Sequence, residues 1–562
     1  MTLRRLALVL ACVFLAAGCS TYSVKPLTVP LVSKWDRFEM TLQSRAAYVN
    51  PVQDTGLEAV FIGPSGEVHK VDGFWDGTNT WRVRFSPNEI GSWKYETYCA
   101  NPADGGLHLQ TGRFLCTAPK HEHRFARHGP VRVHRSGRYF EHEDGTPFFW
   151  MGDTAWSGPL KAEDHEWDLY LGERKRQGFT AVQWVSTQYR ASPDGDQNGE
   201  LAYAGDHRII LNPRFFQRLD RRVEAMNREG FLSVPVMLWD NPGRAGSRSS
   251  PGSALPEDQL IVLARHLAAR WSANHVIWLV NGDGDYRGGR AERWKRVGRA
   301  VFGNISHAPV SLHPGGRQWV WDEFQSERWL DICGYQSGHN EREDNVRWIH
   351  SGPPSTAWRR PPFRPFLSLE APYENHGGAD RKPMGAFVVR RAHYWSLLNA
   401  PTCGVVYGGH GVWGWDDGSG PPFDHPDTGT PLPWFRAMRM EGAEQMGFLA
   451  RFFTSLDFNR LRPAPGILRG QPGERSPHQF ISCSQSEDRA LTVIYTPEST
   501  DILLSPAGLP HDFRANWFNP RHGGYHAAKA EFRGEAVGFS PPGGGDWLLK
   551  IEADRSLERQ NR

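Results

Sequence analysis

Two acidic residues stand directly after apolar stretches of the sequence. Asp283 ends WLVNGD (278–283), and Glu370 ends RPFLSLE (364–370). Glycoside hydrolysis needs two carboxyl groups flanking the scissile bond, about 5–5.5 Å apart for retention and about 6.5–9.5 Å apart for inversion. One must be protonated and the other ionised when the reaction begins. The pair predicts acid–base and nucleophilic chemistry on a sugar if the fold brings both carboxyl groups to one face.

The segment NGDGDYRGG (281–289) admits other interpretations. Closely spaced oxygen ligands could form a calcium loop, but Arg287 stands where a third acidic ligand would be expected. Asn, Gly and Asp also form ordinary turns. Asp285 could take the acid role in place of Asp283. These alternatives stay open, and we expect neither a metal nor an organic cofactor.

Eight short apolar runs alternate with amphipathic segments between residues 125 and 455, and this pattern must position the two carboxylates. The runs are 148–151, 180–185, 231–238, 276–280, 310–312, 331–335, 366–369 and 404–407. In the segment 214–230, apolar residues recur on one helical face, and Gly178 and Gly230 stand where helix C-caps belong. The pattern predicts an α/β fold with a central (β/α)₈ TIM barrel. An open, doubly wound sheet is the alternative.

A barrel of this kind carries its site on the loops that follow the strands. Carboxylates, imidazoles, amides and aromatic rings gather there, a mixture suited to binding sugars. The predicted substrate-binding residues are Asp153, Trp156, Gln188, His313, Gln336, His339, Tyr373, Glu374, Tyr407, His410 and Trp413. Each also has a structural interpretation: Trp156 could pack, Asp153 could cap a helix, and Glu374 could hold Glu370 or a neighbouring Tyr.

Short alternating runs cut by turn signals flank the barrel on both sides. They predict an N-terminal β-sandwich over 35–119 and a C-terminal β-sandwich over 460–562. Cys99 and Cys116 flank an expected hairpin and could form a disulfide, with two buried free thiols as the alternative. No CxxC pair occurs, which argues against a zinc or redox motif.

The first nineteen residues, MTLRRLALVLACVFLAAGC, combine a basic start with a short apolar stretch. This is the pattern of a secretory signal. LAAGC resembles a bacterial lipobox, so Cys19 is the expected lipidation site, residues 20–34 the tether, and Ser20 implies sorting to the outer membrane. The expected location is therefore a lipid anchor in the outer membrane.

The balance of charges and the number of aromatic residues indicate which class of partner the protein binds. With 65 basic and 62 acidic residues, the net charge of +3 gives no field that would attract nucleic acid. The chain also holds 23 Trp residues, whose faces stack on sugars but also fill cores. A polysaccharide or oligosaccharide is the expected partner.

Residues 130–455 resemble the apiosidase-like glycoside hydrolases, a retaining (β/α)₈ family. The matching segments are GDTAW (152–156), WLVNGD (278–283), LHPGG (312–316), LDICGYQSGH (330–339), RPFLSLEAPYE (364–374) and YGGHGVWGW (407–415). The resemblance implies Asp283 as acid/base, Glu370 as nucleophile, and a furanosidic or branched pentose as substrate. Where the family usually has Glu-Pro, this chain has Glu370-Ala371-Pro372. The C-terminal segment resembles a β domain labelled collagen-binding in such proteins.

Three other functions are compatible with the sequence. The same carboxylates could serve an inverting hydrolase if they lie further apart. The barrel could be the scaffold of a non-catalytic glycan-binding lipoprotein, since fold alone does not imply activity. An adhesin acting through residues 460–562 is the third.

Overall fold

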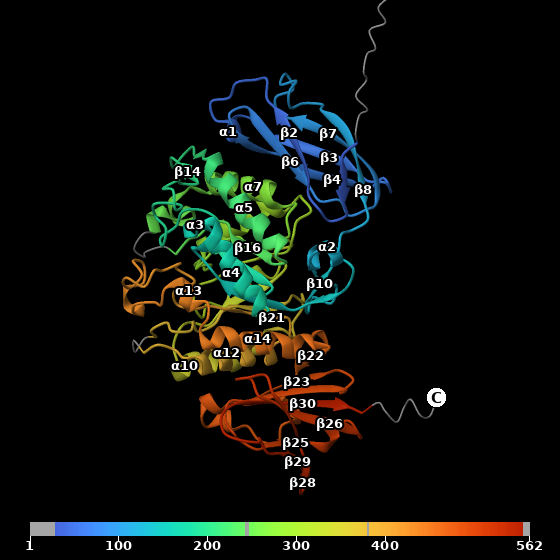
Figure 1. Ribbon diagram of the computed structural model, residues 1–562, viewed down its shortest axis with the longest axis vertical. Coiled ribbons are helices and arrows are strands. Elements are labelled where there is room, and N and C mark those ends of the chain that lie inside the picture. Colours follow the sequence, from blue (N-terminus) through green and yellow to red (C-terminus); the bar gives the residue numbers. More distant parts are fainter. Residues whose placement is uncertain (1–28, 242–246, 379–381, 555–562) are drawn as a thin grey trace, which may run out of the picture.

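The computed structural model describes residues 29–241, 247–378 and 382–554 (Figure 1). Three parts follow one another along the long axis of the molecule: an N-terminal β domain, a central α/β part and a C-terminal β domain (Figure 1). The predicted signal, Cys19 and most of the predicted tether lie outside the described residues. No helix of the described residues is long and apolar enough to cross a membrane.

The central part is a closed parallel barrel. Its strands are β12 (Trp150–Thr154), β13 (Ala181–Val185), β16 (Leu232–Val236), β17 (Trp278–Leu279), β18 (Val310–Ser311), β19 (Cys333–Gln336), β20 (Phe366–Glu370) and β21 (Gly404–Tyr407). They form one sheet in the order β18-β17-β16-β13-β12-β21-β20-β19. A parallel bridge between Ser311 and Ile332 joins its two ends. Each predicted run overlaps one of these barrel strands. The predicted TIM barrel is therefore confirmed and the open sheet is excluded.

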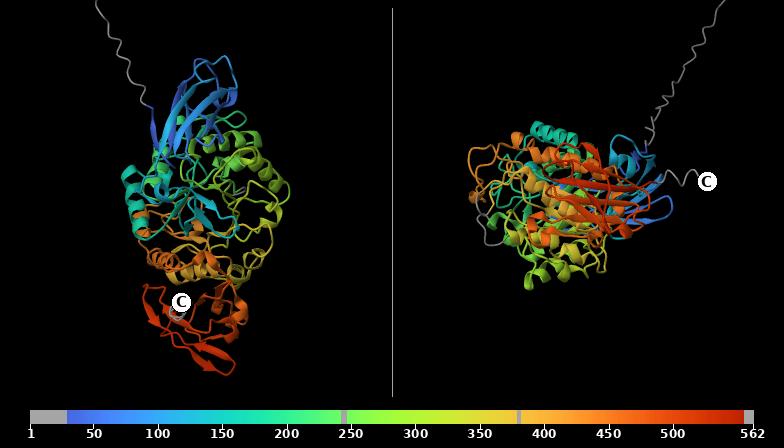
Figure 2. Two further views of the ribbon diagram at one scale, coloured as in Figure 1. Left: turned by 90° about the vertical axis from the view of Figure 1, so that its right-hand side faces the viewer. Right: turned by 90° about the horizontal axis from the view of Figure 1, so that it is seen from below.

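Helices form a ring outside these strands (Figure 2). The main ones are α4 (Asp164–Arg176), α5 (Pro213–Arg228), α7 (Glu257–Trp271), α8 (Gly289–Phe302), α10 (Glu343–Ser351), α12 (Ala386–Leu398) and α14 (Glu441–Thr454). In α5, Phe215, Leu219 and Val223 are buried along one face. Gly178 and Gly230 follow α4 and α5 with φ of 86° and 85°, the left-handed conformation that ends helices. The barrel strands are therefore covered on their outer side and buried on both faces.

The N-terminal domain packs two antiparallel-rich sheets around an aromatic core. One sheet has the order β1-β8-β7-β3-β4 and the other β2-β6-β5. Their strands are β1 (Leu31–Ser33), β2 (Phe38–Gln43), β3 (Leu57–Ile62), β4 (Val68–Asp72), β5 (Phe74–Gly77), β6 (Thr80–Phe85), β7 (Gly91–Cys99) and β8 (Thr111–Thr117). Phe61 stacks on Phe85 with ring centroids 4.2 Å apart. This domain is the β-sandwich expected from the alternating runs.

Cys99 and Cys116 are free and buried, so the alternative of two buried free thiols holds and the disulfide does not. Cys116 on β8 pairs with Gly91 at the start of β7, whereas Cys99 is the last residue of β7. At about 3.3 Å per residue, the two thiols lie at opposite ends of a nine-residue strand. A disulfide cannot span that separation.

Buried charges fix the N-terminal domain to the barrel. Asp220 of α5 accepts hydrogen bonds from Arg84 of β6 at 2.7 Å and from Arg270 of α7 at 2.8 Å. Burial raises the pKa of Asp220, but the two guanidinium groups outweigh it and hold that pKa well below its usual range. The seam between the two domains is therefore a fixed surface of the molecule.

The C-terminal domain is also built from two sheets, in the orders β22-β23-β24-β30-β26-β27 and β25-β29-β28. The strands are β22 (Leu461–Pro463), β23 (Ser482–Ser486), β24 (Leu491–Thr496), β25 (Ile502–Leu504), β26 (Phe513–Phe518), β27 (Tyr525–Ala527), β28 (Glu531–Arg533), β29 (Ala536–Phe539) and β30 (Trp547–Ala553). It packs against α12 and α14 (Figure 1). Arg390 of α12 pairs with Asp546 at 2.7 Å in this buried contact.

Candidate active site

Asp283 and Glu370 both lie close to one imidazole ring at the carboxyl ends of the strands. Glu370 is the last residue of β20, and Asp283 follows β17 with a left-handed φ of 50°. His313, which follows β18, has Nδ1 4.0 Å from Asp283 Oδ1 and Nε2 3.4 Å from Glu370 Oε2. The fold thus brings the two predicted carboxylates to one face of the barrel.

Glu370 is held in place through both of its oxygens. Tyr373 donates its hydroxyl proton to Oε2 at 2.6 Å, and His339 Nε2 lies 2.7 Å from Oε1. His339 Nδ1 accepts a hydrogen bond from the Tyr373 amide, so Nε2 carries the proton and donates it to Glu370. Burial raises the pKa of Glu370, but hydrogen bonds and charge from His313 and His339 outweigh it and keep the pKa below its usual range. The result is an oriented, ionised carboxylate.

His313 balances the charge between the two acids. Its ring is fully buried, which lowers its pKa, but the neighbouring carboxylates of Glu370 and Asp283 outweigh this and raise it. A protonated imidazole at this position offsets negative charge that would otherwise accumulate in a buried site.

Asp283 is more open than Glu370 and accepts hydrogen bonds from two amides. Its side chain is 20% exposed, against 8% for Glu370. Gln336 donates to Oδ1 at 2.8 Å and Asn241 to Oδ2 at 3.1 Å. Arg190 lies 3.4 Å from Oδ2. Asp283 is therefore the carboxylate better placed to meet a leaving group or a water molecule.

Four residues at this site were not predicted from the sequence: Arg190, Asn241, Asp424 and His425. Arg190 pairs with Asp424 at 2.7 Å and approaches both ring nitrogens of His425. Arg190 directly follows the STQY stretch after β13, and Asn241 ends the WDN stretch after β16, so a wider census of strand ends would have found both. Asp424 and His425 lie seventeen and eighteen residues beyond β21, where no periodic pattern points to them.

Two indoles line the site beside His313. The rings of Trp156 and Trp239 meet edge to face, with centroids 5.3 Å apart, and Trp156 approaches the His313 ring at 5.2 Å. Trp413 meets His425 at 5.2 Å in the same manner. Of the predicted substrate-binding residues, the structure brings Trp156, His313, Gln336, His339 and Tyr373 together around the two carboxylates.

Other predicted substrate-binding residues make hydrogen bonds within the protein. Glu374 accepts a hydrogen bond from Tyr407 at 2.5 Å and another from the Gly442 amide at 2.8 Å. It thus holds a neighbouring Tyr, one of the structural alternatives. The Gln188 side chain accepts from the Ala202 amide, and both ring nitrogens of His410 have protein partners. These residues shape the loops around the site.

Asp153 is likewise engaged within the protein. It is fully buried, pairs with Arg174 of α4 at 2.6 Å and accepts a hydrogen bond from Tyr170 at 2.5 Å. Its side chain therefore joins a strand to a helix.

We expect Asp153→Ala to lower the free energy of unfolding by about 3–5 kcal/mol, because Arg174 would keep a buried charge without a partner. Urea unfolding followed by tryptophan fluorescence would measure the change. In the double variant Asp153→Ala/Arg174→Met, part of the loss should be recovered. Unchanged stability combined with lost hydrolysis would return Asp153 to the role of a sugar ligand.

Asp285 is turned toward arginines. Its oxygens lie 2.8 Å from Arg287 and 3.2 Å from Arg290. Asp283, by contrast, faces the imidazole that also contacts Glu370. Within the described residues, no group of three or more His, Cys, Asp or Glu side chains could hold a metal ion.

A closed (β/α)₈ barrel with two carboxylates at the carboxyl ends of its strands is an arrangement that glycoside hydrolases use. More specifically, the chain belongs to the apiosidase-like family, whose catalytic domain matches residues 134–460. Residues 31–100 match a domain family of unknown function, and residues 463–552 match a family described as a collagen-binding domain of a collagenase. The predicted family is confirmed.

Solved structures share the fold. A protein titled glycoside hydrolase is 21% identical with a TM-score of 0.67, covering 78% of this chain and 99% of its own. A family 5 glycoside hydrolase from Bacteroides vulgatus is 20% identical with a TM-score of 0.65, covering 79% and 100%. Another glycoside hydrolase structure from Bacteroides vulgatus is 18% identical with a TM-score of 0.69, covering 93% and 99%. No curated protein matches the chain in sequence.

Proposed function

We propose that the chain hydrolyses a glycosidic bond with retention, using Glu370 as nucleophile and Asp283 as acid/base. The observation that carries this proposal is the environment of Glu370. Its carboxylate is buried and ionised, and Tyr373 and His339 hold its two oxygens. A nucleophile that must attack a single carbon benefits from such fixed orientation and from the absence of competing water.

In the first step, Glu370 attacks the anomeric carbon while Asp283 gives a proton to the leaving oxygen. The glycosidic bond breaks, and an ester forms between the sugar and Glu370. In the second step, Asp283 takes a proton from water, the water oxygen attacks the anomeric carbon, and Glu370 leaves as a carboxylate. The greater exposure of Asp283 suits this role, since both the leaving group and the water must reach it.

We propose a furanosidic or branched pentose within a complex polysaccharide as the substrate. The family is described as apiosidase-like, and the indoles of Trp156 and Trp239 offer apolar faces beside the carboxylates.

We also propose export and lipidation at Cys19, which would hold the enzyme at the outer membrane. The lipobox-like LAAGC supports this second proposal.

Product stereochemistry tests the mechanism. Wild-type enzyme would be offered aryl glycosides of apiofuranose, arabinofuranose and xylopyranose, and the first product formed would be observed by proton NMR before it mutarotates. We expect hydrolysis of at least one pentoside, with the anomeric configuration of the substrate kept. An inverted first product would replace the nucleophile with a water molecule activated by one of the same carboxylates.

A further inference from the structure

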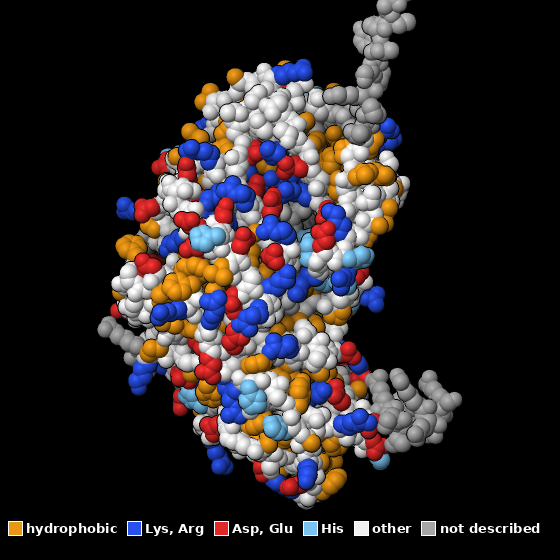
Figure 3. Space-filling view, in the orientation of Figure 1, with side chains coloured by type: hydrophobic (Ala, Val, Ile, Leu, Met, Phe, Trp, Pro, Cys, Tyr) orange, Lys and Arg blue, Asp and Glu red, His pale blue; other side chains and the backbone are white. Residues whose placement is uncertain are grey.

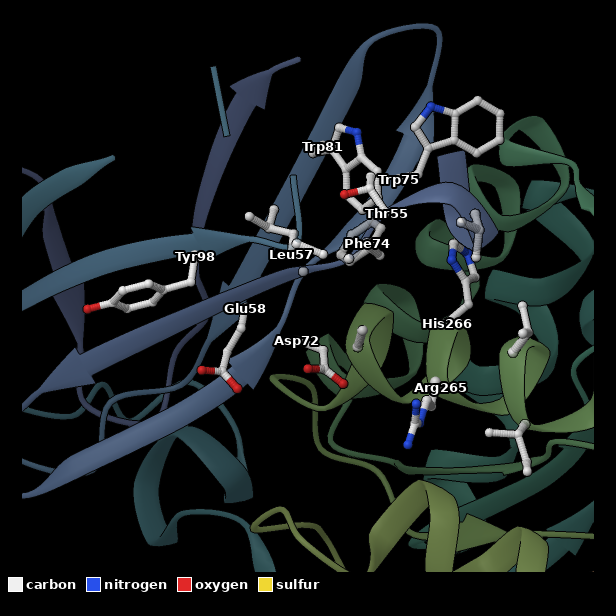
Figure 4. Close-up of a pocket in the computed structure, with 17 residues that line it drawn as sticks. Thr55, Leu57, Glu58, Asp72, Phe74, Trp75, Trp81, Tyr98, Arg265 and His266 are labelled. Carbon is white, nitrogen blue, oxygen red and sulfur yellow. The ribbon is translucent and has the colours of Figure 1, made fainter. Parts of the chain in front are cut away.

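Three hollows lie in series over the N-terminal domain and its seam with the barrel. The outer hollow, about 720 Å³, lies on the open face of β3, β7 and β8 and includes Val60, Lys94, Glu96, Tyr98 and Arg113. The middle hollow, about 380 Å³, lies between this domain and α7 (Figure 4). The inner hollow, about 500 Å³, lies between the β5–β6 hairpin and the start of α5. Together, the three hollows are far larger than a single sugar.

An aromatic side chain stands at each junction between these hollows. Tyr98 lines both the outer and the middle hollow, and the residue is 41% exposed. Trp75 lines both the middle and the inner hollow. Its indole nitrogen donates to the Thr78 carbonyl at 2.9 Å, which fixes the ring. Figure 4 shows the two rings at opposite sides of the middle hollow. We name this series of hollows and rings the aromatic track.

Acidic and basic side chains both line the aromatic track. Asp72 at the end of β4 faces Arg265 of α7 across the middle hollow (Figure 4). The outer hollow places Glu96 beside Lys94 and Arg113. Over the face of the molecule seen in Figure 3, blue and red side chains are likewise interspersed. Such a lining matches hydroxyl groups, which both donate and accept hydrogen bonds, better than it matches a polyanion.

We propose that the aromatic track binds a polysaccharide chain without cleaving it. Aromatic rings at the junctions would stack on the C–H faces of successive sugars, and the mixed polar lining would bind their hydroxyl groups. The inner hollow includes Asn212, at the end of the long β13–α5 connection that also carries Arg190 of the active site. A chain held along the track is therefore fixed to the same rigid body as the catalytic residues. The proposal goes beyond the hydrolytic function and does not depend on the assignment of the nucleophile.

Affinity electrophoresis tests the proposal with the full chain carrying both Asp283→Ala and Glu370→Gln, so that the polymer in the gel is not degraded whichever of the two carboxylates is the nucleophile. Native gels would contain galactan, arabinan or xylan. We expect at least one of them to retard the protein, and we expect Trp75→Ala or Tyr98→Ala to weaken that binding by about tenfold. Phe532, which is 82% exposed on β28 of the C-terminal domain, provides the matched control, and Phe532→Ala should leave the retardation unchanged.

Each other outcome overturns the proposal. No retardation by any of the three polymers would remove the track as a glycan site. Retardation that survives in the double variant Trp75→Ala/Tyr98→Ala, or that falls equally in Phe532→Ala, would place binding elsewhere. Thermal unfolding of every variant is recorded, and if Trp75→Ala unfolds earlier than its parent, the exposed Tyr98→Ala variant decides. Because binding is measured without hydrolysis, failure here is distinct from failure of the retaining mechanism.

Discussion

Glu370→Gln will lower kcat on the best aryl glycoside by about 10⁴-fold or more, an effect of the size seen when an enzyme loses its nucleophile. Glutamine keeps the shape of the side chain: its amide oxygen can still accept the hydrogen bond from His339, and its NH2 group can donate to the Tyr373 hydroxyl oxygen. It cannot form the glycosyl ester, because its amide oxygen is a far weaker nucleophile than a carboxylate. Steady-state rates on the pentoside panel measure the loss.

The chain offers a matched control four residues away. Glu374 is also buried and also accepts a hydrogen bond from a tyrosine, Tyr407. Glu374→Gln should keep kcat near the wild-type value and lower the free energy of unfolding by about 1–3 kcal/mol, the cost of disturbing a buried hydrogen bond. If Glu370→Gln keeps wild-type activity, the nucleophile is another residue. If Glu374→Gln is as inactive as Glu370→Gln, the structural role given to Glu374 is wrong.

The barrel could be predicted from the sequence because each of its strands and helices carries a recognisable pattern within a short stretch of the chain. A strand covered by helices outside and by side chains inside is apolar along its whole length, and β13 and β16 are buried at every position. The connecting helices show the complementary signal, an apolar stripe at helical spacing. When apolar strand runs and amphipathic helix segments alternate eight times, few architectures other than a (β/α)₈ barrel are compatible with the sequence.

The site was harder to predict, because position at a strand end does not tell where a side chain points. Asp153 and Glu370 both belong to the ends of barrel strands, yet one pairs with Arg174 of an outer helix and the other faces His313. The partner that decides each case is distant in the sequence. Asp424, which pairs with Arg190, is 234 residues away from it. Register explains the cysteines in the same way, since a hairpin brings residues together by pairing and not by nearness in the chain.

Asp283→Ala should produce a second, diagnostic phenotype. On an unactivated glycoside the rate should fall by about 10²–10⁴-fold, because the leaving oxygen must depart without a proton. On an aryl glycoside with a good leaving group, the first step needs no acid, so Glu370 still forms the ester. The ester then accumulates, since no base activates the water that should cleave it. A pre-steady-state burst of phenol would reveal this accumulation.

Azide should then restore turnover, because it is already an anion and attacks the ester without a general base. The product would be a glycosyl azide with the configuration of the substrate, and mass spectrometry and NMR would identify it. Asp285→Ala is the control: Asp285 pairs with the exposed Arg287 and Arg290, so its kinetics should stay close to wild type and should not respond to azide. Rescue of Asp285→Ala, without rescue of Asp283→Ala, would move the acid/base two residues along the loop. Rescue of Asp283→Ala alone would establish that the aspartate facing His313 serves as both the acid and the base.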